Sequence, residues 1–387
     1  MNETGFPINP APPEDSRFNP PHHPKSTMPE SPTSALSPEC VQWAYRLFLD
    51  REPETPSVVQ EKLRQFSTTR DLRSDFMKSP EFREKAGQPD SLPQSPFFHF
   101  AAAFDPLAVM RCHAVSDLQP KPGYLTNFLG VAIDPKFFPT ILKGREGSVE
   151  AIPIPANWHA DIAEWGAALR AVDLSQDTFT MIELGCGWGC WMNNTGVAAR
   201  AAGRRVHVIG VEGDEGHARF AQESLTTNGF KQNEFTVHRG IAAARSGVAL
   251  FPKQGVPGVE WGGEAVFDAT ASQRVKALSS GAYEELPMIA LSEITAPHAR
   301  IDLLHVDIQG GEADLIDQCL TLLDEKVSYM VIGTHSKQIE GRLYETLLNA
   351  GWLLEMERPA IFTVNGGKPC IAVDGVQGWR NGKLLPI

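Results

Sequence analysis

Between residues 178 and 349, short apolar runs typical of strands alternate with longer segments whose apolar residues recur at helical spacing. The predicted strands lie at 179–184, 206–211, 234–239, 301–306 and 327–333, and the predicted helices at 190–202, 215–228, 312–323 and 338–349. This alternation favours a mainly parallel sheet with flanking helices, an α/β fold. The apolar runs on either side of Gly366 and Gly367 predict two further strands at the end of the chain.

A glycine-rich loop follows the first predicted strand in the segment FTMIELGCGWG, where Glu183 precedes Gly185, Gly187 and Gly189. Glycine permits tight turns and close approach of a ligand to the backbone. The carboxyl edge of the strands is also where open α/β sheets bind ligands. A dinucleotide fingerprint would read G-x-G-x-x-G, and here the third glycine comes one residue early. The spacing of the glycines therefore argues against a pyrophosphate site. The alternative to any ligand-binding loop is an ordinary turn between a strand and a helix.

The next two predicted strands end in residues suited to a nucleoside. Glu212 closes the second strand, where its carboxylate can accept hydrogen bonds from ribose hydroxyls. The alternative for Glu212 is a solvated acid, and Asp214 is interpreted as a helix N-cap. Gly240, Ile241 and Ala242 follow the third strand and offer a small apolar surface for a flat base. Together with the glycine loop, these residues predict a nucleoside-containing cofactor.

The segment RIDLLHVDIQGGEADLID supplies candidate catalytic groups. Asp307 is expected at the sheet edge, where a carboxylate can orient or deprotonate an acceptor hydroxyl. His305 lies two residues earlier on the same strand face, and His335 follows a later strand. Histidine has the side-chain pKa closest to neutrality, so both are alternative bases. The competing interpretations are a buried, hydrogen-bonded core residue for His305 and, for His335 together with Ser336, a cap of the following helix.

Composition narrows the class of protein. The net charge of −12 argues against general nucleic-acid binding, which requires a basic surface. No apolar run approaches the roughly 20 residues of a membrane helix, and the N-terminus lacks signal-peptide features. A cytoplasmic location is therefore expected. The cysteines at 186 and 190 have no second pair nearby, so they are interpreted as packing residues and no metal site is predicted.

Four segments are expected along the chain. Ten of the 30 prolines lie in the first 38 positions, which indicates a disordered tail over 1–37. A small all-α module is predicted for 38–87, because Val41, Ala44, Leu47 and Phe48 form a helical stripe after Pro38. Residues 88–155 are interpreted as an irregular connection or lid. The α/β domain is predicted for 156–387.

Two motifs resemble known methyltransferases. The pattern from Glu183 to Gly189 resembles motif I of class I S-adenosylmethionine-dependent methyltransferases, which implies a Rossmann-like sheet, S-adenosylmethionine as cofactor and Glu183 near its methionine amino group. Residues 302–312 resemble the FkbM-type signature D-L-L-K-I-D-V-E-G-A-E. The matching residues are Asp302, Leu303, Leu304, Asp307, Gly310 and Glu312, and the departures are His305, Gln309 and Gly311. This resemblance covers about 156–375 and implies O-methylation, commonly of a sugar hydroxyl in a glycan, glycolipid or glycosylated metabolite.

Residues 45–82 resemble a small helical domain of unknown function that accompanies bacterial surface-glycan proteins. That resemblance implies association with a surface-glycan assembly. Arg46 and Arg51 are candidate contacts for an acidic glycan, and the alternative is that they are ordinary solvated charges on a helix. Two alternatives stand beside the methyltransferase interpretation. One is a degenerate methyltransferase fold that serves as a glycan-binding or scaffold protein. The other is an NAD-type oxidoreductase.

Overall fold

The computed structural model describes residues 36–49, 51–79, 81–82 and 95–386. The chain divides into two compact units, residues 1–92 and 93–387, and each is treated separately. The predicted tail lies outside the described residues except for its last two positions. The four-segment division of the chain stays a prediction.

The described residues of the first unit include the helices α1 (Pro38–Leu49), α2 (Pro56–Gln65) and α3 (Thr69–Lys78). Proline occupies the start of α1 and α2, where its missing N–H costs nothing. The hydroxyl of Thr68 accepts the amide of Asp71 and caps α3. Tyr45 and Phe76 meet edge to face in the small core, with ring centroids 4.8 Å apart. This confirms the predicted helices at the N-terminus.

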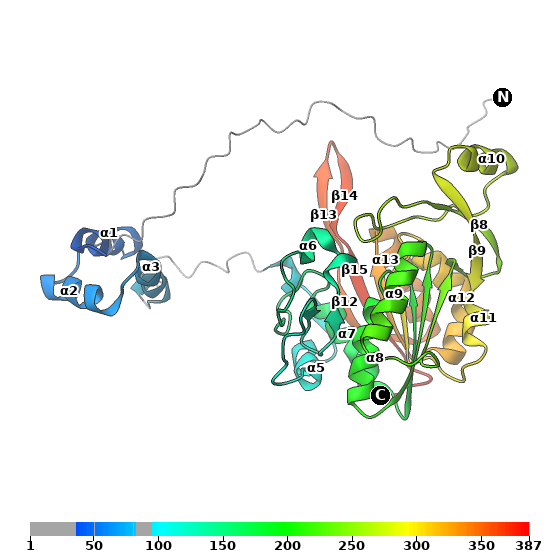
Figure 1. Cartoon of the computed structure of the whole chain (residues 1–387), viewed down its shortest axis with the longest axis horizontal. Coiled ribbons are helices and arrows are strands. Elements are labelled where there is room, and N and C mark those ends of the chain that lie inside the picture. Colours follow the sequence, from blue (N-terminus) through cyan, green and yellow to red (C-terminus); the bar gives the residue numbers. More distant parts are fainter. Residues whose placement is uncertain (1–35, 50, 80, 83–94, 387) are drawn as a thin grey trace. The chain divides into compact units, whose positions relative to one another are not determined.

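An eight-stranded sheet forms the centre of the second unit (Figure 1). Its strand order is β1-β12-β15-β11-β10-β4-β5-β6. The parallel strands β4, β5, β6, β10 and β11 confirm the predicted α/β fold with a Rossmann-like sheet. Their bounds are β4 Thr178–Leu184, β5 Arg205–Glu212, β6 Phe235–Arg239, β10 Leu303–Val306 and β11 Tyr329–Thr334.

The other edge of the sheet is antiparallel and was not fully predicted. β15 (Gly375–Asn381) pairs antiparallel with both β11 and β12 (Trp352–Arg358), and the short β1 (Ala101–Ala102) pairs with β12. The hairpin of β13 (Ile361–Asn365) and β14 (Lys368–Val373) surrounds the Gly-Gly turn. The sequence predicted two strands in this region, whereas the structure has four.

Helices cover both faces of the sheet. They are α5 Pro106–His113, α6 Pro139–Leu142, α7 Ile162–Leu174, α8 Cys190–Ala201, α9 Glu215–Thr227, α11 Leu291–Thr295, α12 Glu312–Lys326 and α13 Lys337–Ala350. The side chains of Asp161, Asp214 and Ser336 accept amide hydrogens at the starts of α7, α9 and α13. None of the helices in the described residues has the length and apolarity needed to cross a bilayer.

Side chains along each strand point alternately to the two faces of the sheet, and each face carries its own apolar core. On β4, Phe179 and Met181 face one core and Ile182 and Leu184 face the other. Residues before 156 also join the first core through α5, α6, the 3₁₀ turn Pro135–Phe137 and the short strands β2 (Leu125–Thr126) and β3 (Ala132–Ile133). A second 3₁₀ turn, Pro96–Phe98, buries none of its residues. This packing places 95–155 against the sheet.

An insertion between β6 and β10 forms a second, three-stranded sheet in the order β7-β9-β8, with α10 (Ala271–Ser279). Its strands are β7 Ile241–Ala243, β8 Gly247–Pro252 and β9 Tyr283–Ala290. The sequence analysis did not predict β8, β9 or α10. The loop between β8 and α10 carries Trp261 over the carboxyl edge of the main sheet.

Candidate active site

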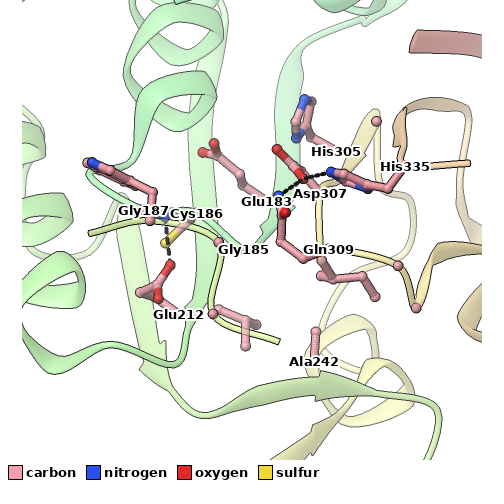
Figure 2. Close-up of a pocket in the computed structure, with 18 of the residues that line it drawn as sticks. Glu183, Gly185, Cys186, Gly187, Glu212, Ala242, His305, Asp307, Gln309 and His335 are labelled. Carbon is pink, nitrogen blue, oxygen red and sulfur yellow. Dashed lines mark hydrogen bonds and ion pairs between the residues drawn. The ribbon is translucent and has the colours of Figure 1, made fainter. Parts of the chain in front are cut away.

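The order of the strands in the sheet reverses at β4: β5 and β6 follow on one side of it, and β10 and β11 follow on the other. Such a switch point opens a crevice at the carboxyl ends of the strands. A pocket of about 810 Å³ lies there (Figure 2). Of the site residues predicted from sequence, Glu183, Gly185, Gly187, Glu212, Gly240, Ile241, Ala242, His305, Asp307 and His335 line it. Gly189 does not line it and instead begins α8.

The loop after β4 requires glycine at alternate positions. Gly185, Gly187 and Gly189 all have positive φ angles, of 75°, 52° and 75°. A Cβ atom on Gly185 would lie 2.0 Å from the carbonyl oxygen of Asp307, and one on Gly187 would lie 2.9 Å from the ring of Trp261. The loop is therefore held tightly between β10 and the inserted segment.

The buried carboxylate of Glu183 anchors the start of α8. It accepts the amides of Trp191 and Met192 at 3.2 and 2.9 Å. Burial raises its pKa to about 7. A contact between Glu183 and a cofactor amino group stays a prediction.

Glu212 connects the end of β5 to the glycine loop. Its two oxygens accept the amides of Gly187 and Asp214, each at 2.8 Å (Figure 2). Burial raises the pKa of Glu212 to about 7. An ionised carboxylate can accept about four hydrogen bonds, so capacity remains for ligand hydroxyls.

The residues expected beside a flat base belong to β7 and the turn before it. Ile241 and Ala242 are buried, and Ala242 lies at the edge of the pocket (Figure 2). A Cβ on Gly240 would lie 2.7 Å from both Ile289 and the carbonyl oxygen of Pro287. Gly240 is thus required for packing against β9, whatever it contacts in the pocket.

His305 is buried and paired. Its Nε2 lies 3.1 Å from Glu164 on α7, and Nδ1 has no hydrogen-bond partner among the described residues. Burial lowers the pKa of His305, but Glu164 outweighs this effect and the net shift is upward. Burial raises the pKa of Glu164, whose Oε1 also accepts the indole N–H of Trp191 at 3.2 Å. Glu164 was not predicted from the sequence, although an acid in the first turn of a mostly apolar helix was an available signal.

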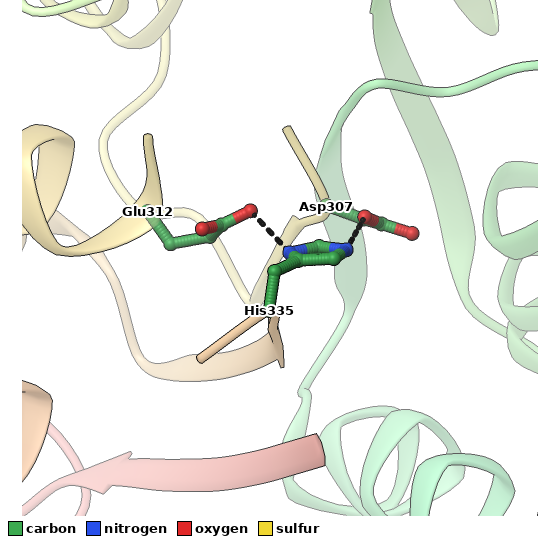
Figure 3. Close-up of side chains that lie close together, drawn as sticks. All are labelled: Asp307, Glu312 and His335. Carbon is green, nitrogen blue, oxygen red and sulfur yellow. Dashed lines mark hydrogen bonds and ion pairs between the residues drawn. The ribbon is translucent and has the colours of Figure 1, made fainter. Parts of the chain in front are cut away.

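Asp307, His335 and Glu312 converge from the ends of β10 and β11 and the start of α12 (Figure 3). Nδ1 of His335 is 2.9 Å from Glu312, and Nε2 is 3.3 Å from Asp307. Burial lowers the pKa of His335, but the two carboxylates raise it further, to about 10. Burial raises the pKa of Asp307, and hydrogen bonds from His335 and Gln309 turn the net shift downward. Ser336 caps α13, whereas the side chain of His335 contacts the two carboxylates instead of the helix end.

Aromatic rings form the opposite wall. Trp261 stacks on His217 and Phe138 at centroid distances of 4.0 and 4.6 Å. Trp158 and Trp188 also line the pocket.

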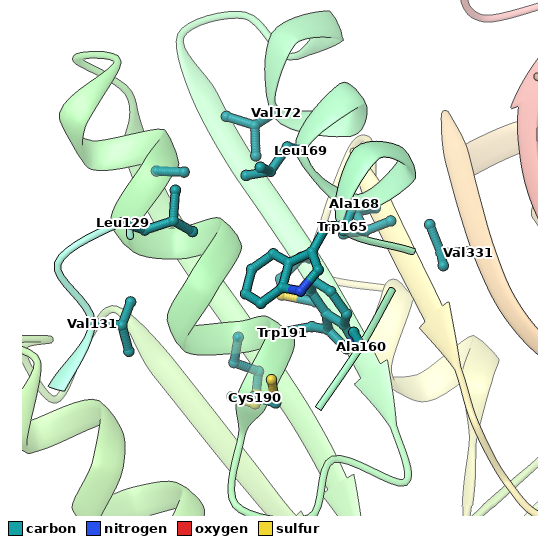
Figure 4. Close-up of a cluster of buried hydrophobic side chains, with 14 of the residues drawn as sticks. Leu129, Val131, Ala160, Trp165, Ala168, Leu169, Val172, Cys190, Trp191 and Val331 are labelled. Carbon is teal, nitrogen blue, oxygen red and sulfur yellow. The ribbon is translucent and has the colours of Figure 1, made fainter. Parts of the chain in front are cut away.

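Trp191 also lines the pocket, and it meets Trp165 edge to face at 4.9 Å in the apolar core (Figure 4). Cys190 contacts Nε2 of His159, whose pKa burial lowers to about 4. The cysteines at 186 and 190 are buried and free.

A protein from Jannaschia sp. (strain CCS1), named "Putative methyltransferase", is 48% identical to this chain over 261 residues. The match spans 67% of this chain and 93% of that relative. The chain belongs to this methyltransferase family. No protein-family model matches the chain.

Solved structures similar to this methyltransferase have low identity. The human methyltransferase 10 domain containing protein is 12% identical, with a TM-score of 0.32 and coverage of 72% of this chain and 98% of that one. Precorrin-6y C5,15-methyltransferase from Geobacter metallireducens GS-15 is 9% identical, with a TM-score of 0.30 and coverage of 55% and 86%.

The pocket of this methyltransferase is strongly acidic. Nine acidic residues and two arginines line it. Both arginines are already paired, Arg245 with Asp268 at 2.6 Å and Arg358 with Asp161. The acids are Asp161, Glu164, Glu183, Glu212, Glu264, Asp268, Asp307, Asp314 and Asp374. Such a lining attracts a cationic ligand and repels a polyanion.

Proposed function

We propose that this methyltransferase transfers a methyl group from S-adenosylmethionine to a hydroxyl of a sugar-containing acceptor: a glycan, a glycolipid or a glycosylated metabolite. The acidic pocket carries the cofactor part of the proposal. S-adenosylmethionine is a sulfonium cation and suits this lining. The pyrophosphate of NAD would instead face the seven acids that remain after the two lining arginines pair with two of the nine.

In the proposal the two substrates occupy different sides of the pocket. Glu212 and Gly187 lie at one side, and Asp307 and His335 lie at the other (Figure 2). In the proposal Glu212 accepts the ribose hydroxyls, Glu183 faces the methionine amino group and Ala242 lies against the adenine. S-adenosylmethionine supplies an electrophilic methyl group on sulfur. Positioning of the acceptor oxygen in line with that methyl is then the main task of the protein.

The acceptor side offers rings and hydrogen-bond acceptors together. Trp158 and His159 present aromatic surface, and Glu164, His305 and Asp307 present polar atoms. This combination suits a polyhydroxylated ring, which has both apolar faces and many hydroxyls. It supports a sugar hydroxyl as the methyl acceptor.

Geometry ranks the three candidate bases. Both nitrogens of His335 are engaged, by Glu312 and Asp307, so this residue has no free atom for the acceptor. Asp307 keeps a side chain that is 43% exposed. His305 keeps one unpartnered nitrogen among the described residues. In the proposal Asp307 receives or directs the hydroxyl proton, His305 is the alternative base, and His335 is a positioning residue.

Calorimetric titration of the full chain with S-adenosylmethionine, S-adenosylhomocysteine and NAD tests the cofactor. We expect saturable binding of the first two and none of NAD. NAD binding alone would favour an oxidoreductase. Binding of no ligand would favour the scaffold alternative. Once the cofactor is established, transfer of a radiolabelled methyl group to a panel of glycans identifies the acceptor, and labelling at nitrogen or carbon instead of oxygen would refute O-methylation.

A further inference from the structure

The cluster of Asp307, Glu312 and His335 has the geometry of a metal site that no sequence motif indicated. The three side chains each offer a ligand atom, and these atoms lie within 4.8 Å of one another. Asp307 follows β10 directly, Glu312 is the first residue of α12 and His335 follows β11 directly (Figure 3). Three separate backbone elements therefore fix the cluster.

Glu312 fixes a hydrogen on Nδ1 of His335. Its side chain is fully buried and also accepts the amides of Ile308 and Gly310, at 3.2 and 3.0 Å. The same oxygen, Oε1, accepts both amides and therefore also acts as the acceptor toward His335. The contact at 2.9 Å therefore requires a hydrogen on Nδ1 of His335.

The opposite nitrogen then faces a second carboxylate. Nε2 lies 3.3 Å from Oδ1 of Asp307. In the ion-free protein a hydrogen on Nε2 bridges these two atoms, and a divalent cation bound by both atoms can replace that hydrogen. A buried carboxylate that holds the far nitrogen of a histidine, with the near nitrogen beside another ligand, is the usual arrangement around protein-bound metals.

Two features of the surroundings point to a ligand. Nδ1 of His305, on the strand that leads to Asp307, has no partner among the described residues and the side chain is buried. Asp374 also lines the pocket and interacts electrostatically with Asp307, Glu312 and His335. The region thus combines excess negative charge with an unsatisfied polar atom.

We propose that Asp307 and Nε2 of His335 bind a divalent first-row transition-metal cation, with Glu312 orienting the imidazole. One nitrogen and carboxylate oxygens form a mixed ligand set that suits Mn²⁺, Fe²⁺ or Co²⁺ better than Mg²⁺, which prefers oxygen alone. Two protein ligands leave positions open toward the pocket. Cation binding itself is independent of the proposed function. A role in holding the acceptor hydroxyl as a Lewis acid rests on that function.

The test is titration of the full chain, freed of metal with a chelator, with MnCl₂ and separately with CoCl₂. Calorimetry and the loss of the free Mn²⁺ electron paramagnetic resonance signal report binding. We expect one ion per chain, and a Co²⁺ absorption band that reports nitrogen ligation. Loss of an orienting partner typically lowers metal affinity by about 10–100-fold, so Glu312→Gln should fall in that range and Asp307→Asn should lose at least as much.

A matched control lies outside the pocket. Nε2 of His113 is 2.9 Å from Asp173, a histidine–carboxylate pair to which the described residues add no third ligand. Asp173→Asn should leave Mn²⁺ binding unchanged. If Glu312→Gln does not fold, His335→Gln replaces it.

Failure of the wild-type chain to bind either ion would overturn the proposal, because a proton alone would then bridge His335 and Asp307. Binding that survives both Asp307→Asn and His335→Gln would also overturn it. The binding of S-adenosylhomocysteine in the presence of chelator is measured separately, so either idea can fail without the other.

Discussion

Replacement of Glu212 by alanine tests the cofactor site through its pH dependence. Hydrogen bonds to a charged group contribute about 1.5–3 kcal/mol, so Glu212→Ala should weaken S-adenosylhomocysteine binding about 10–150-fold at pH 8. At that pH a carboxyl with a pKa of about 7 is mostly ionised in the free protein. The substitution should therefore cause its largest loss of affinity at this pH.

At pH 6 the loss of affinity caused by Glu212→Ala should be smaller. Burial raises the pKa of Glu212, so only about one tenth of the free protein carries the ionised group at pH 6. Apparent affinity scales with the fraction of protein competent to bind, so the advantage of wild type over Glu212→Ala should fall about tenfold between pH 8 and pH 6. Glu183 also has a pKa of about 7, but it is present in both proteins and cancels in their ratio.

Calorimetry at pH 6, 7 and 8 measures this ratio directly. Asp214→Ala is the control, because Asp214 lies two residues away and caps α9 through the amide of His217 at 2.8 Å. It should lose about 1 kcal/mol of stability and retain its affinity at pH 8. A penalty for Glu212→Ala that stays constant with pH, or unchanged affinity in the folded variant, would refute the assignment.

Four further predictions concern the remaining parts of the molecule. Asp307→Asn should lower turnover about 10²–10⁴-fold with little change in cofactor affinity, and near-full turnover would exclude Asp307 as the base. A chain that begins at residue 93 should still bind S-adenosylhomocysteine, because the pocket residues all follow that position; a folded chain that cannot bind contradicts this. Gly185→Ala should abolish cofactor binding, since its Cβ would lie 2.0 Å from a carbonyl oxygen, whereas Gly203→Ala, with φ of 78° and open space around it, should lose only about 1–2 kcal/mol of stability; equal binding losses would argue against steric closure of the loop. Trp165→Ala should destabilise the protein by about 3–5 kcal/mol in urea unfolding, and a loss below about 1 kcal/mol would mean that the core collapses around the gap.

Local patterns explain what the sequence predicted well. The strand before Gly185, the helix after it and the position of Glu212 all follow from periodicity and glycine within a few dozen residues. The fold class was accessible for the same reason. The predicted strand at 301–306 is shorter in the structure, where β10 spans Leu303–Val306.

Long-range partners could not be predicted in this way. Glu164 and His305 are separated by 141 positions, and nothing near either residue indicates the other. Glu312 matched a signature residue at the start of the predicted helix 312–323, but nothing near it in the sequence indicated its contact with His335. The inserted strand β15 lies between β11 and β12, an order that only tertiary packing decides.

The stack of Trp261 between His217 and Phe138 has a kinetic consequence. The ring lies directly against the glycine loop, since a Cβ on Gly187 would approach it to 2.9 Å. A ligand that enters or leaves beside Gly187 must first separate these rings. Aromatic contacts of this type contribute about 0.5–1.5 kcal/mol each, so two of them add about 1–3 kcal/mol to the barrier. For the proposed cofactor, the rate at which Trp261 separates from His217 and Phe138 would then set how fast the demethylated product dissociates, and with it the turnover rate.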